Sequence, residues 1–442
     1  ISFEDIFMEM IGIIEKKRDG KKLQSSDIEY FVKGYTKGDI PDYQASAFLM
    51  ACYIRGLDRE ETFLLTEAMR DTGKKADLSS IEGIKVDKHS TGGVGDKTTL
   101  ITGPLAASLG VPVAKMSGRS LGFTGGTVDK MESIPGMKVS LKEEDFIRQV
   151  NEKGIAVIGQ TPDIAPADKL IYSLRDVTGT VDNASLITAS IMSKKLALGS
   201  DAILLDVKCG SGAFMQDYDD ACDLAKMMVY IGNAAGKRTV AAVTDMDQPL
   251  GHAIGNSIEV IEAIEVLKGE GPEDITELSV TLAGLMAYMG EKAPSPEEGK
   301  LLAKEKLYDG KGLEKFRQFV EAQGGNPEII ENYMLFPQAK HSIDILSDNN
   351  GYIVGIDADK TGEASRHTGA GREVKGQKID LSAGIYLHKK VGDHVKEGDI
   401  LATLQGNSKK KLLVSAGICK EAFHMAGSRP DKELLIRSII GL

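Results

Sequence analysis

The segment from Lys88 to Thr99 has the clearest chemical character in the sequence. Lys88, Ser90 and Thr99 are side-chain donors, and with His89 they surround the glycine-rich turn Gly92-Gly93-Val94-Gly95. A turn of this kind between a strand and a helix points backbone N–H groups and the positive helix end at an anion. The spacing matches neither the nucleotide-hydrolysing P-loop nor the dinucleotide-binding glycine fingerprint. We therefore expect a phosphate site that does not hydrolyse nucleotides.

Two further glycine-rich segments follow expected strands. The second runs from Lys115 to Glu132 and contributes the hydroxyls of Ser117 and Thr127. The third, residues 208–213, could bind an anion or act as a hinge. Loops at the ends of neighbouring parallel strands converge on one crevice. The first two segments are therefore expected to form one site.

Two helical segments carry polar pairs at helical spacing. Tyr172 and Arg175 are three residues apart, and Ser190 and Lys194 are four apart. Each pair therefore shares one helix face. Arg175 can donate parallel hydrogen bonds to a planar ligand, and Lys194 adds a point charge.

The elements that must position these residues indicate an α/β protein. Apolar stripes predict a discontinuous all-helical domain from residues 8–72 and 166–198. Short β-branched segments at 84–87, 111–116, 155–159, 202–207 and 239–243, alternating with helices, predict a larger α/β domain with a mixed sheet, made of residues 84–160 and 201–335. From 342 to 442 we expect a β-rich α+β domain, without helical periodicity until its end. Its turns at 392–399 resemble biotinyl carrier domains but lack the attachment lysine, so we interpret them as scaffold.

Composition excludes several functions. The chain has 442 residues and a net charge of −11, which argues against a nucleic-acid or anionic-lipid partner. No apolar run approaches the ~20 residues of a membrane span, and acidic residues near the start argue against a signal peptide. The four cysteines lie far apart, which favours reduced thiols. We expect a cytoplasmic protein that acts on small molecules.

Four motifs in order closely resemble the thymidine and pyrimidine-nucleoside phosphorylases, most of all the bacterial pyrimidine-nucleoside enzymes. They begin at Lys88, Ser117, Leu174 and Ser190, and the resemblance covers nearly the whole chain. It implies a homodimer formed through the helical domain, with inorganic phosphate as co-substrate and no organic cofactor. The implied reaction is reversible phosphorolysis of uridine, thymidine and deoxyuridine to the base and a pentose 1-phosphate.

The resemblance also assigns roles to individual residues. His89, Arg175 and Lys194 are expected to be catalytic, with His89 donating a proton or a hydrogen bond to the departing base. The nucleoside ligands it implies are Tyr172, Arg175, Ser190, Lys194 and Lys115. The phosphate ligands it implies are Lys88, Ser90, Thr99, Lys115, Ser117 and Thr127.

Some positions depart from the family pattern. Ser120 and Phe123 replace small and histidine residues in the second segment, which puts cleft closure or sugar preference in question. Some relatives bind potassium at positions that match Gly95, Leu250, Ala253 and Glu262. Lys97 stands where those relatives have Thr, so its ammonium could replace the ion and remove potassium dependence. Lys115, where strict thymidine phosphorylases tend to have Met, favours uridine as a substrate.

Other functions are compatible with parts of the pattern. They are a thymidine-restricted phosphorylase, an anthranilate-type phosphoribosyltransferase of the same fold, an archaeal-type nucleoside-monophosphate phosphorylase, and a non-catalytic ligand-binding protein. A pure binding protein would not need Lys88, His89, Arg175 and Lys194 together.

Overall fold

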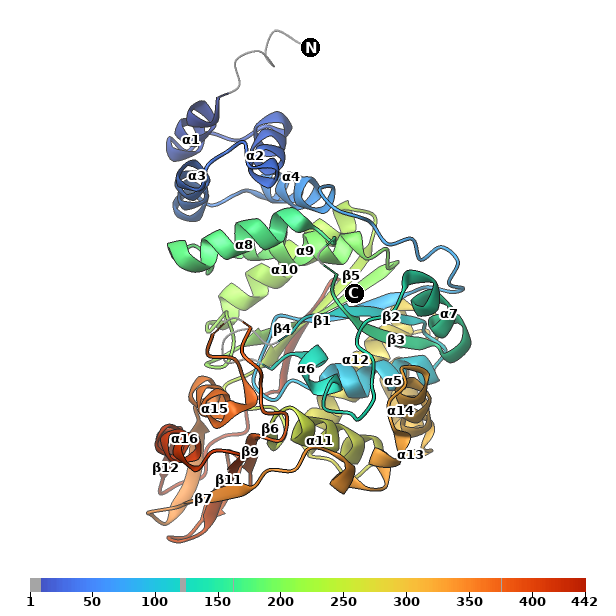
Figure 1. Cartoon of the computed structure of the whole chain (residues 1–442), viewed down its shortest axis with the longest axis vertical. Coiled ribbons are helices and arrows are strands. Elements are labelled where there is room, and N and C mark those ends of the chain that lie inside the picture. The colour runs from blue at the N-terminus through green and yellow to red at the C-terminus, as the bar shows by residue number, and fades with distance from the viewer. Residues whose placement is uncertain (1–8, 120–124, 162, 375) are drawn as a thin grey trace.

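Helices from two stretches of the chain pack into one helical layer (Figure 1). The computed structural model describes residues 9–119, 125–161, 163–374 and 376–442. A single buried cluster joins residues of both stretches, including Phe31, Phe48, Ile171 and Leu186. The helices of this layer are α1 (Met10–Arg18), α2 (Ser25–Lys37), α3 (Asp42–Arg55), α4 (Arg59–Arg70), α8 (Pro166–Thr178) and α9 (Ala184–Ala197).

A buried carboxylate at Glu61 fixes the start of α4. Asp58 caps the helix by accepting from the Glu61 N–H at 2.8 Å, and the Glu61 side chain accepts from the Asp58 N–H at 2.9 Å. This is a capping box, which satisfies two backbone donors of the first turn. Glu61 also accepts from Lys17 Nζ at 2.8 Å. Local capping and packing against α1 therefore use the same side chain.

The central sheet has the order β1-β4-β5-β13. The first three strands are parallel, and β13 pairs antiparallel with β5, so the sheet is mixed as expected. Alternate residues of β4 enter two different cores, Leu204 on one side and Leu205 on the other, because successive strand side chains face opposite ways. A separate parallel pair is formed by β2 and β3. The strands are β1 (Val86–Ser90), β2 (Val113–Ser117), β3 (Ile155–Gly159), β4 (Ala202–Cys209), β5 (Arg238–Asp245) and β13 (Ile436–Ile440).

Helices cover both faces of this sheet (Figure 1). The helices around it are α5 (Thr98–Ser108), α6 (Thr127–Met131), α7 (Glu143–Lys153), α10 (Tyr218–Ala234), α11 (Ser257–Leu267), α12 (Glu273–Met289), α13 (Pro296–Tyr308) and α14 (Lys311–Ala322), followed by the short turns η1 (Pro327–Ile330) and η2 (Tyr333–Leu335). The strand expected at 84–87 begins at Val86, because the Lys85 N–H and C=O both bond to the turn at 201–202. Lys88, His89 and Ser90 consequently lie within β1 and not in a loop.

The C-terminal domain exchanges strands with the α/β domain. Its sheet has the order β6-β9-β11-β7, in which β6 comes from the sequence of the α/β domain. In return, β13 comes from the C-terminal sequence and joins the central sheet. A second sheet has the order β10-β8-β12. The strands are β6 (Ala253–Gly255), β7 (His341–Leu346), β8 (Gly351–Ile356), β9 (Gly384–Leu387), β10 (His394–Val395), β11 (Ile400–Gly406) and β12 (Phe423–Ala426).

The expectation of no helix before the end of this domain is wrong. The domain contains α15 (Ala358–Ser365), continued by the π-helical turn η3 (Arg366–Ala370), and α16 (Lys409–Glu421). Small residues make the first of these helices hard to recognise, and α16 buries only a narrow stripe at Leu412, Ser415 and Cys419.

Among the described residues, no helix is long and apolar enough to cross a membrane. The four cysteines are buried and unpaired, in agreement with the sequence prediction.

Candidate active site

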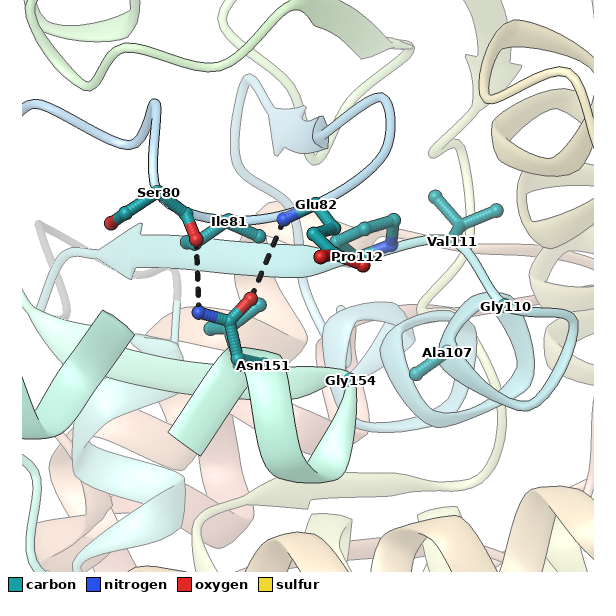
Figure 2. Close-up of a pocket in the computed structure, with 10 residues that line it drawn as sticks. Ser80, Ile81, Glu82, Ala107, Gly110, Val111, Pro112, Asn151 and Gly154 are labelled. Atoms are coloured by element: carbon teal, nitrogen blue, oxygen red, sulfur yellow. Dashed lines mark hydrogen bonds between the residues drawn. The ribbon is translucent and has the colours of Figure 1, made fainter. Parts of the chain in front are cut away.

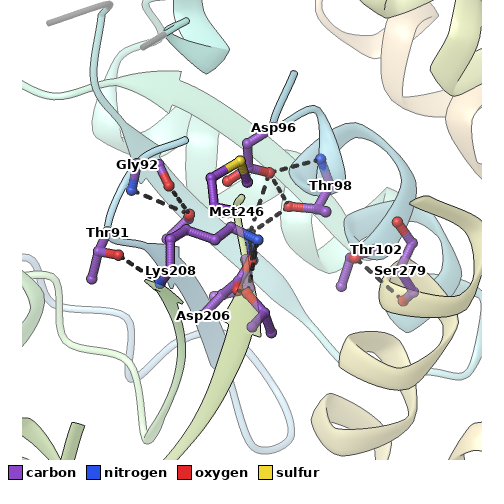
Figure 3. A network of polar contacts seen from close by, with 12 residues as sticks. Thr91, Gly92, Asp96, Thr98, Thr102, Asp206, Lys208, Met246 and Ser279 are labelled. Atoms are coloured by element: carbon purple, nitrogen blue, oxygen red, sulfur yellow. Dashed lines mark hydrogen bonds and ion pairs between the residues drawn. The ribbon is translucent and has the colours of Figure 1, made fainter. Parts of the chain in front are cut away.

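The carboxyl end of β1 packs against a buried network of charges (Figure 3). Asp206 on β4 receives Lys88 Nζ at 3.3 Å and Lys208 Nζ at 2.8 Å. Lys88 also donates to the Thr98 hydroxyl at 2.5 Å, and Asp96 accepts from the Thr98 hydroxyl at the same distance. The network therefore holds the Lys88 ammonium at the amino end of α5, where the helix dipole favours an anion.

The opposite face of β1 joins three elements through Asp87. This fully buried carboxylate lies 2.8 Å from Lys195 Nζ on α9 and 3.6 Å from Lys115 Nζ on β2. Lys115 also donates to the backbone oxygen of Lys88. The helical layer, β1 and β2 thus meet at one carboxylate.

The paired charges leave one positive charge in excess when Lys115 is protonated. Lys88, Lys115, Lys195 and Lys208 face the carboxylates of Asp87, Asp96 and Asp206. Burial, opposed by Asp87 and reinforced by Lys195 and Lys88, lowers the pKa of Lys115 to about 7. A bound anion would offset this surplus, which makes the site suited to phosphate.

His89 is neutral at physiological pH in this environment. Burial, followed by the charges of Lys195, Lys115, Lys194 and Lys88, lowers its pKa well below the ordinary value. A neutral imidazole has one N–H donor. His89 can therefore donate one hydrogen bond as a neutral ring and is not held as a charged acid. The contact between β1 and the helical layer is the ion pair of Asp87 with Lys195 described above.

On the helical side, Lys194 is held by its neighbours on α8 and α9. Its Nζ lies 2.7 Å from the buried carboxylate of Asp168 and 3.5 Å from the Ser190 hydroxyl. The expected pair of Ser190 and Lys194 is therefore in contact. Tyr172 stacks with Arg175, whose guanidinium carbon lies 5.9 Å from the ring centre.

Arg175 is more constrained than its expected role suggested. It is 1% exposed and donates to the backbone oxygens of Thr180, Val181 and Leu186 at 2.9, 2.6 and 3.1 Å. These contacts use three of the five N–H groups of a guanidinium. Burial lowers the pKa of Arg175 to about 10, which keeps it charged at neutral pH. The other two N–H groups form no hydrogen bond with the described residues, and the three backbone contacts fix the orientation of the guanidinium.

The second segment contributes Ser117 and Thr127 from its described flanks. Ser117 ends β2 beside Gly159, and Thr127 begins α6; both are half-buried. Thr99 is half-buried in the first turn of α5. Ser120 and Phe123 lie outside the described residues.

A pocket of about 430 Å³ lies away from these groups (Figure 2). Its lining includes Pro112 and Gly154, which precede the amino ends of β2 and β3. Ser117 and Gly159 lie at the carboxyl ends of the same strands. Asn151 bridges one wall by donating to the Ser80 oxygen at 3.0 Å and accepting from the Glu82 N–H at 3.4 Å. This pocket is therefore separate from the candidate site.

Family models match three parts of the chain. The glycosyl transferase family helical bundle domain matches residues 11–73, and the glycosyl transferase family a/b domain matches residues 82–313. The pyrimidine nucleoside phosphorylase C-terminal domain matches residues 352–425. The chain belongs to the pyrimidine-nucleoside phosphorylase family. It is therefore a pentosyltransferase that acts in pyrimidine-nucleoside phosphorolysis.

Individual relatives agree with this assignment. The pyrimidine-nucleoside phosphorylase of Geobacillus stearothermophilus is 55% identical over 400 residues, which are 90% of this chain and 92% of the relative. The enzyme of the same name from Bacillus subtilis is 53% identical over equal shares. Anthranilate phosphoribosyltransferase of Thermus thermophilus shares the fold, with a TM-score of 0.57 at 19% identity, covering 70% of this chain and 99% of that one.

Sequence reasoning missed the carboxylates that orient the cations in this phosphorylase. They are Asp87, Asp96, Asp168 and Asp206. One signal was available, because Asp206 and Lys208 are two apart in an otherwise apolar strand and so face the same side. In the third glycine-rich segment, residues 208–213, the Ser211 N–H donates to Asp247 at 2.9 Å, so this donor is already bonded within the protein.

Lys97 lies among the oxygens expected to bind a cation. Its ammonium donates to the backbone oxygens of Leu250 at 3.1 Å and Ala253 at 2.7 Å, and to Glu262. Gly95, with φ of +73°, packs against the same two carbonyls, where any side chain would collide. Burial lowers the pKa of Lys97, but Glu262 and Glu259 more than offset this and the net pKa is raised. The residues present do not fit a potassium ion beside this ammonium.

We predict that exchanging potassium for sodium leaves the activity of the wild-type enzyme unchanged. Lys97→Ser should leave Glu262 buried without its partner, at a cost of about 3–5 kcal/mol. It should also open space for an ion, so its melting temperature should rise in potassium relative to sodium. Lys226→Ser, which removes an exposed pair with Asp223, is the control. Saturable stimulation of the wild type by potassium would contradict the prediction.

We predict that the contribution of Lys115 to phosphate use declines as pH rises through about 7. Below that pH the lowered pKa still leaves the ammonium charged and attractive to an anion; above it the charge is lost. The measurement is the wild-type to Lys115→Met ratio of kcat/KM for phosphate from pH 6 to 8.5. Taking the ratio cancels the titration of phosphate itself. A ratio independent of pH would exclude titration of Lys115 in this range.

Proposed function

We propose that this enzyme catalyses reversible phosphorolysis of uridine, thymidine and deoxyuridine. Phosphate binds between the amino end of α5 and the carboxyl end of β2, and the nucleoside binds against α8 and α9. A phosphate oxygen forms a bond to C1′ as the bond from C1′ to N1 of the base breaks. The products are the free base, which takes up a proton, and ribose or deoxyribose 1-phosphate.

The convergence of cations from two domains around His89 carries this proposal. Lys115 of the α/β domain and Lys195 of the helical layer both pair with Asp87, two residues before His89. Negative charge develops on the pyrimidine ring as the base leaves, so oriented donors lower the barrier. His89 supplies a neutral N–H and Arg175 supplies two N–H groups of fixed direction. Acceptance of uridine beside thymidine rests on the family pattern, in which Lys at position 115 is typical of the pyrimidine-nucleoside enzymes.

The decisive experiment measures loss of uridine, thymidine and deoxyuridine with and without phosphate. We expect phosphate-dependent formation of the base from all three. His89→Ala should lower kcat by about 10²-fold, the cost of one preorganised donor, while the KM for phosphate changes little. Lys33→Ala on the exposed face of α2 is the control. Inactivity on uridine alone would indicate a thymidine-restricted enzyme, and cleavage without phosphate would refute phosphorolysis.

We also propose that the helical layer pairs two copies of the chain. Exposed apolar side chains lie seven or four residues apart on neighbouring helices, with Tyr43, Met50 and Ile54 on α3 and Leu170 and Val177 on α8. Tyr43 and Val177 are 75% and 78% exposed. Large apolar surfaces of this kind are typical of subunit interfaces.

Replacing Tyr43 and Ile54 with Glu should convert the dimer into a monomer, because each carboxylate would have to be buried without a partner. Light scattering after size-exclusion chromatography measures the mass. Tyr308→Glu, at an equally apolar exposed position on α13, should leave the dimer intact. A wild-type chain that is monomeric at micromolar concentration would exclude this assembly.

A further inference from the structure

Helix α6 cannot position itself. It spans only Thr127–Met131, and a helix of this length has too few internal hydrogen bonds to be stable alone. Its first residue is Thr127, to which the family resemblance assigns phosphate binding. The placement of that hydroxyl therefore depends on contacts that α6 makes with other parts of the molecule.

One such contact is a buried carboxylate that faces two arginines. Asp129 is 0% exposed. Arg372 of the C-terminal domain approaches it as a fork, with Nη2 at 2.8 Å from Oδ1 and Nη1 at 3.2 Å from Oδ2. Arg119, at the beginning of the second segment, donates to Asp129 at 3.0 Å and forms two bonds of 2.6 Å to Glu132. Paired N–H donors fix direction as well as charge.

The next residue of α6 is held from another side. The Lys130 ammonium is buried and lies 3.3 Å from Glu259 on α11. Glu259 also accepts from the Gly255 N–H at 2.9 Å, at the end of β6. Consecutive residues of α6 are therefore tied to the C-terminal domain and to α11.

The segment that carries Arg372 is itself anchored to the α/β domain. The Asn256 side chain donates to the Ala370 oxygen at 2.8 Å, and the Ser365 hydroxyl donates to the Ile254 oxygen at 3.1 Å. Gly369 has φ of +112°, which lets the chain turn out of η3 directly before Arg372. Arg372 thus reaches Asp129 from a backbone with a fixed position.

We propose that Arg372 is a positioning residue through which the C-terminal domain sets the phosphate affinity of the enzyme. It acts through Asp129, fixing α6 and with it the Thr127 hydroxyl. This rests on the proposed function only in taking phosphate as the anion bound beside Thr127. The C-terminal domain is then part of the phosphate site, although none of its residues was expected there.

The test compares Arg372→Gln and Arg372→Lys with Lys411→Gln. Lys411 is the matched control, because it pairs with Glu373, next to Arg372, but at the surface and at 3.8 Å. Arg372→Gln should fold, since Arg119 still neutralises Asp129. Its KM for phosphate should rise about tenfold, the loss typical of one charge-assisted hydrogen bond, while the KM for the nucleoside stays near wild type. The phosphate KM of Arg372→Lys should lie between those of the wild type and Arg372→Gln, because lysine keeps the charge but not the paired N–H donors.

Thermal unfolding with and without inorganic phosphate gives a readout besides activity. Arg372→Gln should reduce the phosphate-induced rise in melting temperature, whereas Lys411→Gln should not. A wild-type phosphate KM and a wild-type thermal shift in Arg372→Gln would overturn the inference. So would a lower melting temperature without phosphate combined with an unchanged shift, because the role would then be structural only. If the wild type showed no phosphorolysis but phosphate stabilised it through Arg372, the proposed function would fail and this inference would stand.

Discussion

The candidate site depends on the burial of the Asp87 carboxylate between ammonium groups from separate elements. Lys195 reaches it from α9, and Lys115 reaches it from β2. Removing a carboxylate from water costs several kcal/mol unless opposite charges and donors surround it. The helical layer and the strands of the α/β domain can therefore satisfy Asp87 only by meeting at β1. Because His89 is two residues after Asp87 on β1, this contact brings His89 close to the same lysines.

A second consequence concerns protonation. Burial is the largest cause that lowers the pKa of His89, and the neighbouring lysines add to it because each disfavours another positive charge. Binding of a dianion would weaken that effect. Under the proposed function, the protonation of His89 would then depend on whether phosphate occupies the neighbouring site.

The fold class and the residues at strand ends could be predicted because they depend on local patterns. Glycine-rich turns, apolar stripes and the pairs Tyr172–Arg175 and Ser190–Lys194 are all visible within a few residues. The expectation that the Lys97 ammonium lies among the oxygens of Leu250, Ala253 and Glu262 came from the family resemblance and not from a local pattern. By contrast, Asp206, Asp87 and Arg372 act through contacts between strands and domains, and nothing local distinguishes them from other charged residues. Arg175 is an intermediate case, since its charge was evident but its three bonds to the turn after α8 were not.

Strand β13 closes the edge of the central sheet, where Arg437 meets Asp245 at a separation of 192 residues in the sequence. During synthesis, β5 is made long before its partner exists. Its outer edge must stay unpaired while the helices after it and the C-terminal domain leave the ribosome, and such an edge readily pairs with other chains. Closing so long a connection is entropically slow. We therefore expect the central sheet to be completed late in the folding of this protein. Until β13 pairs with β5, the open edge of β5 is the part of the sheet most able to aggregate with other chains.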